Sequence, residues 1–154
     1  MNLLKWLYKW CLRLAAIPAA ALVVWVIICR VRWVLEDRRC TRTLGEMRTL
    51  ATAVESYSID SCMYLNTGPM MASRLVPFLE PTYVKRTPMH DDWSSDLQYV
   101  GSVNEYTIVS WGADRRPGGG GAVAANGGTT SYRNDIVFAT GSFVQYPDGR
   151  MDPW

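Results

Sequence analysis

An uncharged apolar run at residues 14 to 29, LAAIPAAALVVWVIIC, is the feature that most limits what this chain can fold into. Val31 and the segment Trp33-Val34-Leu35 extend the run past Arg30, which makes it just long enough to cross a bilayer as a helix. We expect residues 1–35 to form a membrane anchor. Its anchoring side chains include Leu14, Val23, Trp25 and Ile28.

Two other interpretations of this run are open, and both fit it less well. A cleaved signal peptide would end near Ala19-Ala20-Ala21, but the apolar residues continue beyond that point. A buried core helix would need a larger downstream domain to cover it, and only about 120 residues follow. The run therefore favours a single membrane span, and the lipid bilayer is the first expected partner.

Charge is unevenly distributed along the chain. Basic residues crowd the first third, and the first acidic residue is Glu36. Basic residues beside an apolar run favour contact with anionic lipid head groups. They lie on both sides of the run, so the positive-inside rule does not decide its orientation. The later chain shows no basic face, and we expect no nucleic-acid partner.

Residues 36 to 60 show an amphipathic helical pattern. Apolar side chains recur at three- and four-residue steps at Leu44, Met47, Leu50, Ala51, Val54 and Tyr57. No proline lies between Pro18 and Pro69, so this helix is expected to continue from the anchor. The stripe predicts the face that packs on a domain formed by residues 36–154.

The remaining chain favours a small antiparallel sheet. Residues 61 to 95 have few regular signals except for a short helix at 73–79. Short β-rich runs follow at residues 97–100, 106–110, 136–138 and 143–146, the last two as a hairpin. The glycine-rich stretch 117–128 is expected to be a flexible loop. The predicted fold class is α+β: a long N-terminal helix, transmembrane and then amphipathic, packed on a small antiparallel β-sheet.

Three phrases carry a resemblance to the major pseudopilins of type II secretion. MRTLATAVESYSIDSCMY, residues 47–64, resembles that family's helix end, with Cys62 at a position where glycine is usual. LVPFLEPTYVKRTPMHDDWSSDLQYV, residues 75–100, is similar to its Pro-x-Asp-x-Trp-Gly-x-x-x-x-Tyr linker, with Ser94 in place of the glycine. EYTIVSWGADRRPGG, residues 105–119, resembles its strand and Gly-Ala-Asp-x-x-Pro-Gly-Gly loop. The resemblance covers roughly residues 38 to 138.

The N-terminal segment departs from the family pattern. Pilin-like proteins carry a short leader that ends in glycine, and a glutamate five residues into the apolar run. Here the first glycine is Gly45, and no carboxylate precedes Glu36. We therefore expect the peptidase site and the filament-pairing glutamate to be absent.

The resemblance implies a structural subunit rather than an enzyme. It would be an assembly subunit of a type II secretion-like envelope machine, with other pseudopilin or secretion-system subunits as partners and homo-oligomers as one form. It implies a bacterial inner-membrane protein with one span and a periplasmic C-terminal domain. The alternative is a standalone anchored periplasmic module that binds a partner and does not enter a filament.

The resemblance also implies a calcium site in the loop after residue 110. Asp114 and Asp135 would supply carboxylate oxygens, and Trp111 and Arg116 main-chain carbonyl oxygens, the ligand type that calcium takes. The next family ligand falls at Val137, which has no side-chain oxygen. In the alternative interpretation, both aspartates cap turns in a metal-free loop.

Other candidate sites have simpler explanations. Cys11, Cys29, Cys40 and Cys62 have no metal-ligand spacing, and one straight helix would hold Cys40 and Cys62 about 33 Å apart, so isolated thiols are expected. His90 lies in a loop without a nucleophile near it in sequence and is expected to be a surface side chain.

Overall fold

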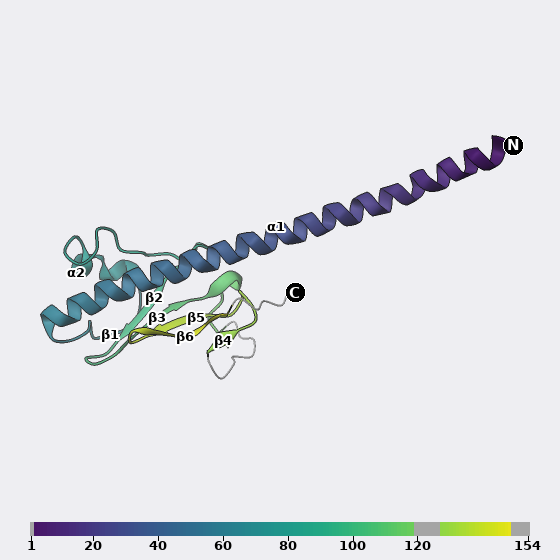
Figure 1. The fold of residues 1–154 in the computed structure, drawn as a ribbon. Coiled ribbons are helices and arrows are strands. Elements are labelled where there is room, and N and C mark those ends of the chain that lie inside the picture. The colour runs from purple at the N-terminus through teal and green to yellow at the C-terminus, as the bar shows by residue number, and fades with distance from the viewer. Residues whose placement is uncertain (1, 119–126, 149–154) are drawn as a thin grey trace. The chain divides into compact units, whose positions relative to one another are not determined.

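A computed structural model describes residues 2–118 and 127–148, with side chains from residue 17 onward (Figure 1). Its longest element is the helix α1, Asn2–Ser61. The chain divides into two compact units, Met1–Leu35 and Glu36–Trp154. The first consists of helix, and the second contains the rest of α1 and the sheet.

The large apolar side chains that the structure describes in the first unit, from residue 17 onward, are exposed. An 18-residue window of the helical stretch Ile17–Ser61 has a mean hydropathy of 1.9 and none of it is buried within the structure, so this helix is long and apolar enough to cross a membrane. Val23, Trp25 and Ile28 are each at least half exposed. The side chain of Leu14 lies outside the described part of the chain.

The second unit begins with the amphipathic part of α1, and the expected stripe is its buried face. Met47, Leu50, Ala51 and Val54 are all at most 2% exposed. Leu44 and Tyr57, at the two ends of the stripe, are partly buried and pack against the same core. The period of the sequence thus predicted which side of the helix meets the sheet.

Six strands form the sheet that α1 packs against (Figure 1). They are β1 (Thr67–Met71), β2 (Gln98–Gly101), β3 (Tyr106–Ser110), β4 (Gly128–Thr129), β5 (Ile136–Ala139) and β6 (Ser142–Pro147). The order across the sheet is β1-β2-β3-β5-β6-β4. Tyr99, Ile108 and Phe138 lie in register on neighbouring strands and form the inner face.

Two features of the sheet differ from the sequence-based expectation. The sheet is mixed, because β4 pairs in parallel with β6, whereas the other neighbouring pairs are antiparallel. β4 is only two residues long, so it leaves no alternating pattern in the sequence. β1 lies in a segment expected to be irregular. It contains Gly68 and Pro69, which weaken a strand signal but are tolerated at the edge of a sheet beside a register shift.

Three short helices connect the strands. η1 (Ala72–Leu75) runs into α2 (Val76–Leu79), which confirms the helix expected at 73–79. Pro77 lies in the first turn of α2, where its missing N–H costs no helical hydrogen bond. η2 (Gly112–Asp114) follows β3. Leu75 and Leu79 are fully buried and close one side of the core.

Aromatic side chains join α1 to the sheet. The Tyr106 ring lies 4.9 Å from Tyr64 and 6.3 Å from both Tyr99 and Phe138, between ring centroids. The Tyr106 hydroxyl donates to Glu55 Oε1 of α1 at 2.5 Å. Burial, and then this carboxylate, raise the pKa of Tyr106, so the phenol stays protonated and keeps the bond.

Candidate functional site

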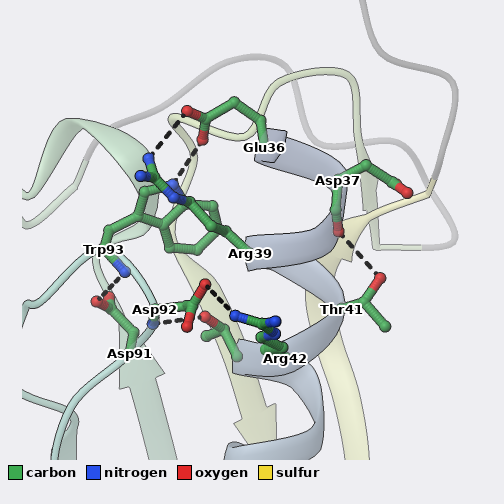
Figure 2. A network of polar contacts seen from close by, with 9 residues as sticks. Glu36, Asp37, Arg39, Thr41, Arg42, Asp91, Asp92 and Trp93 are labelled. Atoms are coloured by element: carbon green, nitrogen blue, oxygen red, sulfur yellow. Dashed lines mark hydrogen bonds and ion pairs between the residues drawn. The ribbon is translucent and has the colours of Figure 1, made fainter. Parts of the chain in front are cut away.

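The loop 90–96 is fixed to the first turns of α1 in the second unit by polar contacts (Figure 2). Trp93 Nε1 donates to Glu36 Oε2 at 2.7 Å, while the indole ring is 3% exposed. The Asp92 N–H donates to Thr43 Oγ1 at 3.0 Å. An Arg42–Asp92 contact of 3.8 Å is long, and Arg42 is largely exposed, so it contributes little.

Asp91 organises the same loop from inside. Its Oδ1 accepts hydrogen bonds from the N–H groups of Trp93 at 3.0 Å and Ser95 at 2.8 Å. Its Oδ2 accepts from Ser110 Oγ at 2.7 Å, which ties the loop to the end of β3. These three donors supply hydrogen bonds to both carboxylate oxygens of Asp91, which is only 4% exposed, as a buried polar group requires. This network positions Trp93 against α1.

Glu46 of α1 lies near the loop 90–96, and His90 is the first residue of that loop. Burial, followed by Asp92 and Asp91, raises the pKa of Glu46, whereas Arg42 and His90 lower it. His90 Nδ1 lies 2.8 Å from Asp96 Oδ1, and both side chains are more than a third exposed. The structure places His90 at the surface, as the sequence predicted.

Asp114 and Asp135 lie at the two stems of the loop for which calcium was expected. Asp114 ends η2, and its Oδ1 accepts from the Arg116 N–H at 3.0 Å. Asp135 immediately precedes β5, and its Oδ2 accepts from the Gly118 N–H at 2.8 Å. Asp114 thus closes a local turn at the first stem, whereas Asp135 links the second stem to Gly118 of the first. The middle of the loop, residues 119–126, lies outside the described residues.

Backbone contacts bring these two stems side by side. The Ala113 N–H donates to the Tyr132 carbonyl oxygen at 2.8 Å. A Cβ on Gly112 would lie 2.4 Å from the Asn134 carbonyl oxygen, and Gly112 has a φ of +63°. Only glycine fits there, because any side chain would collide with the second stem. The close approach of the two stems beside Trp111 therefore depends on Gly112.

The fit of this loop to calcium is partial. Calcium takes six to eight oxygen ligands, commonly including several carboxylates. Between Asp114 and Asp135 the sequence contains no further carboxylate. Over the described ranges, 2–118 and 127–148, no group of three or more His, Cys, Asp and Glu side chains is placed to hold a metal ion. A bound ion would depend on these two aspartates and main-chain oxygens.

The cysteines whose side chains the structure describes are separate thiols. Cys29, Cys40 and Cys62 are free. Burial raises the pKa of the Cys40 thiol to about 12, and Asp37 adds to the shift, so this thiol is unreactive at neutral pH. Cys62 follows the end of α1, is exposed, and has a φ of +58°.

Residues 34–126 match the family model described as type II secretion system (T2SS), protein G. The chain belongs to this family. No curated protein and no solved structure matches it. The match extends from the end of the apolar run through the loop 90–96 and the first stem of the aspartate loop.

The structure explains two departures from the T2SS protein G pattern. Cys62 and Ser94, which stand where related phrases carry glycine, have φ values of +58° and +68°. The fold therefore requires left-handed backbone at both positions, a conformation that glycine adopts without strain. This chain keeps the conformation with a side chain present.

Sequence reasoning missed the polar contacts that fix the loop 90–96. Glu36 and Thr43 lie off the apolar stripe, and periodicity gave no reason to pair them with residues about 50 positions away. The phrase Asp-Asp-Trp-Ser-Ser carried one local signal, because an aspartate followed by serines commonly caps its own turn.

Proposed function

We propose that this protein is a structural subunit of a type II secretion-like pseudopilus, anchored in the bacterial inner membrane by one helix, with its domain in the periplasm. The observation that carries the proposal is the T2SS protein G match over residues 34–126. An apolar helix runs directly into the matched domain, which is the arrangement an anchored subunit needs. Other subunits of the secretion machine are its proposed partners.

The polar groups of the domain support an assembly role rather than catalysis. Asp91 is buried and its oxygens accept hydrogen bonds from the protein itself. Glu36, Thr43 and Trp93 are used to attach a loop to a helix. These contacts hold the loop 90–96 on α1, and we assign no reaction to them.

One observation favours a second candidate, a standalone anchored module outside any filament. The apolar run 14–35 contains no carboxylate, so within it nothing can pair with a neighbouring subunit's terminal amine. In that case the domain would bind a periplasmic partner as a single copy.

Cross-linking of the full chain in phospholipid vesicles separates the two candidates. A series of cross-linked multimers that persists when lipid dilutes the protein supports the pseudopilus subunit. Monomers at every protein-to-lipid ratio would refute it and favour the standalone module.

The exposed thiol of Cys62 tests the orientation. A membrane-impermeant maleimide should label Cys62 in spheroplasts with intact inner membranes, and Cys62→Ser should lose that label. Labelling of Cys62 only after the inner membrane is opened would place the domain on the cytoplasmic side.

Calcium is proposed as a weak ligand of the loop between Asp114 and Asp135. With two carboxylates, affinity should fall at the weak end for calcium, about 10⁻⁴ to 10⁻³ M. The ion would brace the two stems, which the aspartates already hold through the Arg116 and Gly118 N–H groups.

A further inference from the structure

Two arginines interrupt the exposed apolar surface of the first unit near its C-terminal end. Arg30 and Arg32 lie on α1, and both side chains are exposed. The apolar surface continues beyond them, because Val31 and the segment Trp33-Val34-Leu35 are between 39% and 52% exposed. Two cations therefore lie within the surface that lipid would cover, rather than after its end.

The apolar side chains beyond Arg30 determine where a bilayer would end along α1. A boundary at Cys29 would leave Val31 and the segment Trp33-Val34-Leu35 in water, which the hydrophobic effect disfavours. A helix from residue 14 to Leu35 is about 33 Å long at about 1.5 Å per residue, which matches a hydrocarbon core of about 30 Å. The boundary therefore belongs at Leu35.

This boundary sets the depth of the two arginines. Arg30 and Arg32 precede Leu35 by about 7.5 Å and 4.5 Å along the helix axis, at about 1.5 Å per residue. Arginine side chains so close to the end of a span extend along the apolar surface and bring their charged groups to the lipid head groups. Trp33 lies in the same interfacial layer, where tryptophan is enriched.

The chain supplies no anion for these two cations. Within the described residues, neither arginine takes part in an ion pair. The two carboxylates that follow, Glu36 and Asp37, accept hydrogen bonds from the domain. Glu36 pairs with Arg39 and accepts from Trp93 Nε1, and Asp37 accepts from the Tyr132 hydroxyl at 3.2 Å. A charge that leaves bulk water requires a partner, so the anion for the two arginines comes from outside the chain.

We propose that Arg30 and Arg32 bind the phosphate groups of anionic phospholipids in the leaflet at the C-terminal end of the span. A guanidinium group donates two parallel hydrogen bonds to phosphate oxygens, which a single ammonium group cannot match in geometry. The net negative charge of the lipid complements two adjacent cations. This inference rests on the proposed membrane anchor and adds the class of lipid that one end of the anchor selects.

Fluorescence quenching of Trp33 tests this assignment in the full chain. The chain would be reconstituted in phosphatidylcholine vesicles with increasing fractions of phosphatidylglycerol, and one lipid or the other would carry bromine on its acyl chains. Bromine quenches a tryptophan that contacts the lipid, and subtracting the signal of Trp33→Phe isolates Trp33. The test variant combines Arg30→Gln and Arg32→Gln. Its matched control combines Arg74→Gln and Arg133→Gln, which removes the same charge at two exposed positions of the second unit.

The expected result for the unchanged chain is preferential quenching by brominated phosphatidylglycerol. An arginine near an anionic lipid surface contributes about five-fold to binding, so two contribute up to about 25-fold. The binding constant for phosphatidylglycerol relative to phosphatidylcholine should therefore fall by roughly 5- to 25-fold in the test variant. It should not change in the control, and flotation of the vesicles would verify that all variants insert equally.

Three outcomes would overturn the inference. An unchanged relative binding constant in the test variant, with Trp33 quenched by both brominated lipids, would remove the lipid site and leave the membrane anchor standing. An equal fall in the control would indicate attraction by the charge of the whole chain rather than by these two arginines. Absence of Trp33 quenching by either lipid would show that this end of α1 lies outside the bilayer, which would remove both the lipid site and the proposed anchor boundary.

Discussion

Replacing Ser94 by glycine is expected to stabilise the domain. Ser94 has a φ of +68°, in the left-handed region that disfavours side chains with a Cβ atom. Its side chain is exposed, and its hydroxyl makes no hydrogen bond within the described residues. The Ser94 N–H donates to the Asp91 carbonyl oxygen at 3.0 Å, and glycine would keep that bond.

Two opposing contributions set the size of the effect. Left-handed backbone costs a residue with a Cβ atom about 1–2 kcal/mol, which glycine avoids. Glycine also gives the unfolded chain more freedom, which costs about 0.4–1 kcal/mol on folding. The free energy of unfolding should therefore rise by about 0.5–1 kcal/mol. For a domain of this size, the melting temperature would rise by roughly 2–5 °C.

Thermal and urea denaturation of residues 36–154, followed by tryptophan fluorescence, measures the change. Ser94→Ala keeps the Cβ atom and should give no gain. Ser142→Gly, at an exposed strand position without positive φ, should lose about 0.5–1 kcal/mol. A gain from Ser94→Ala as large as that from Ser94→Gly, or a loss from Ser94→Gly, would refute the backbone argument.

Three further changes test the core, the loop 90–96 and the aspartate loop. Leu50→Asp, at a side chain that is 0% exposed, should lower the free energy of unfolding by about 3–5 kcal/mol in urea melts, whereas exposed Thr49→Asp should change it little; similar values for both would mean that the stripe is not core. The pKa of Glu46 is raised above 4.5 in the folded domain, so ionising this carboxyl costs more in the folded domain than in the unfolded chain. The contribution of Glu46 to stability is therefore fully present below pH 4.5 and is lost as pH rises through the folded pKa. Glu46→Gln should therefore raise neutral-pH stability by less than about 1 kcal/mol and flatten the stability-pH curve just above pH 4.5, and an unchanged curve would contradict the assignment. Millimolar calcium should raise the melting temperature slightly and Asp114→Ala should remove the effect; a rise that survives this substitution would place the ion elsewhere.

Hydrogen bonds explain why the loop 90–96, which lies in a phrase that resembles the family, packs on α1. Trp93 is buried because Asp91 shapes its turn and Glu36 accepts the indole N–H. Ser94 then turns the chain back through left-handed backbone. One of the three phrases that carry the resemblance, residues 75–100, therefore contains the loop that is attached to α1.

The sequence alone determined the elements whose signals are local. The apolar run predicted a helix able to span a membrane, and the three- and four-residue spacing from Leu44 to Tyr57 predicted the buried face of α1. Short β-rich runs predicted β3 and the β5–β6 hairpin to within one residue at each end. These predictions succeed because helix and strand periods place side chains in space before any tertiary contact forms.

Only the tertiary structure decided the features that depend on distant partners. β1 and β4 have weak propensity and exist because a neighbouring strand offers hydrogen bonds to them. The contacts of Glu36 and Thr43 with residues 92 and 93, and the pairing of the two stems at Gly112, join segments far apart in sequence. The energies of these contacts depend on the distance between the groups and on their burial, which neither composition nor spacing gives. The period of a helix, in contrast, can be read from the order of residues in the chain.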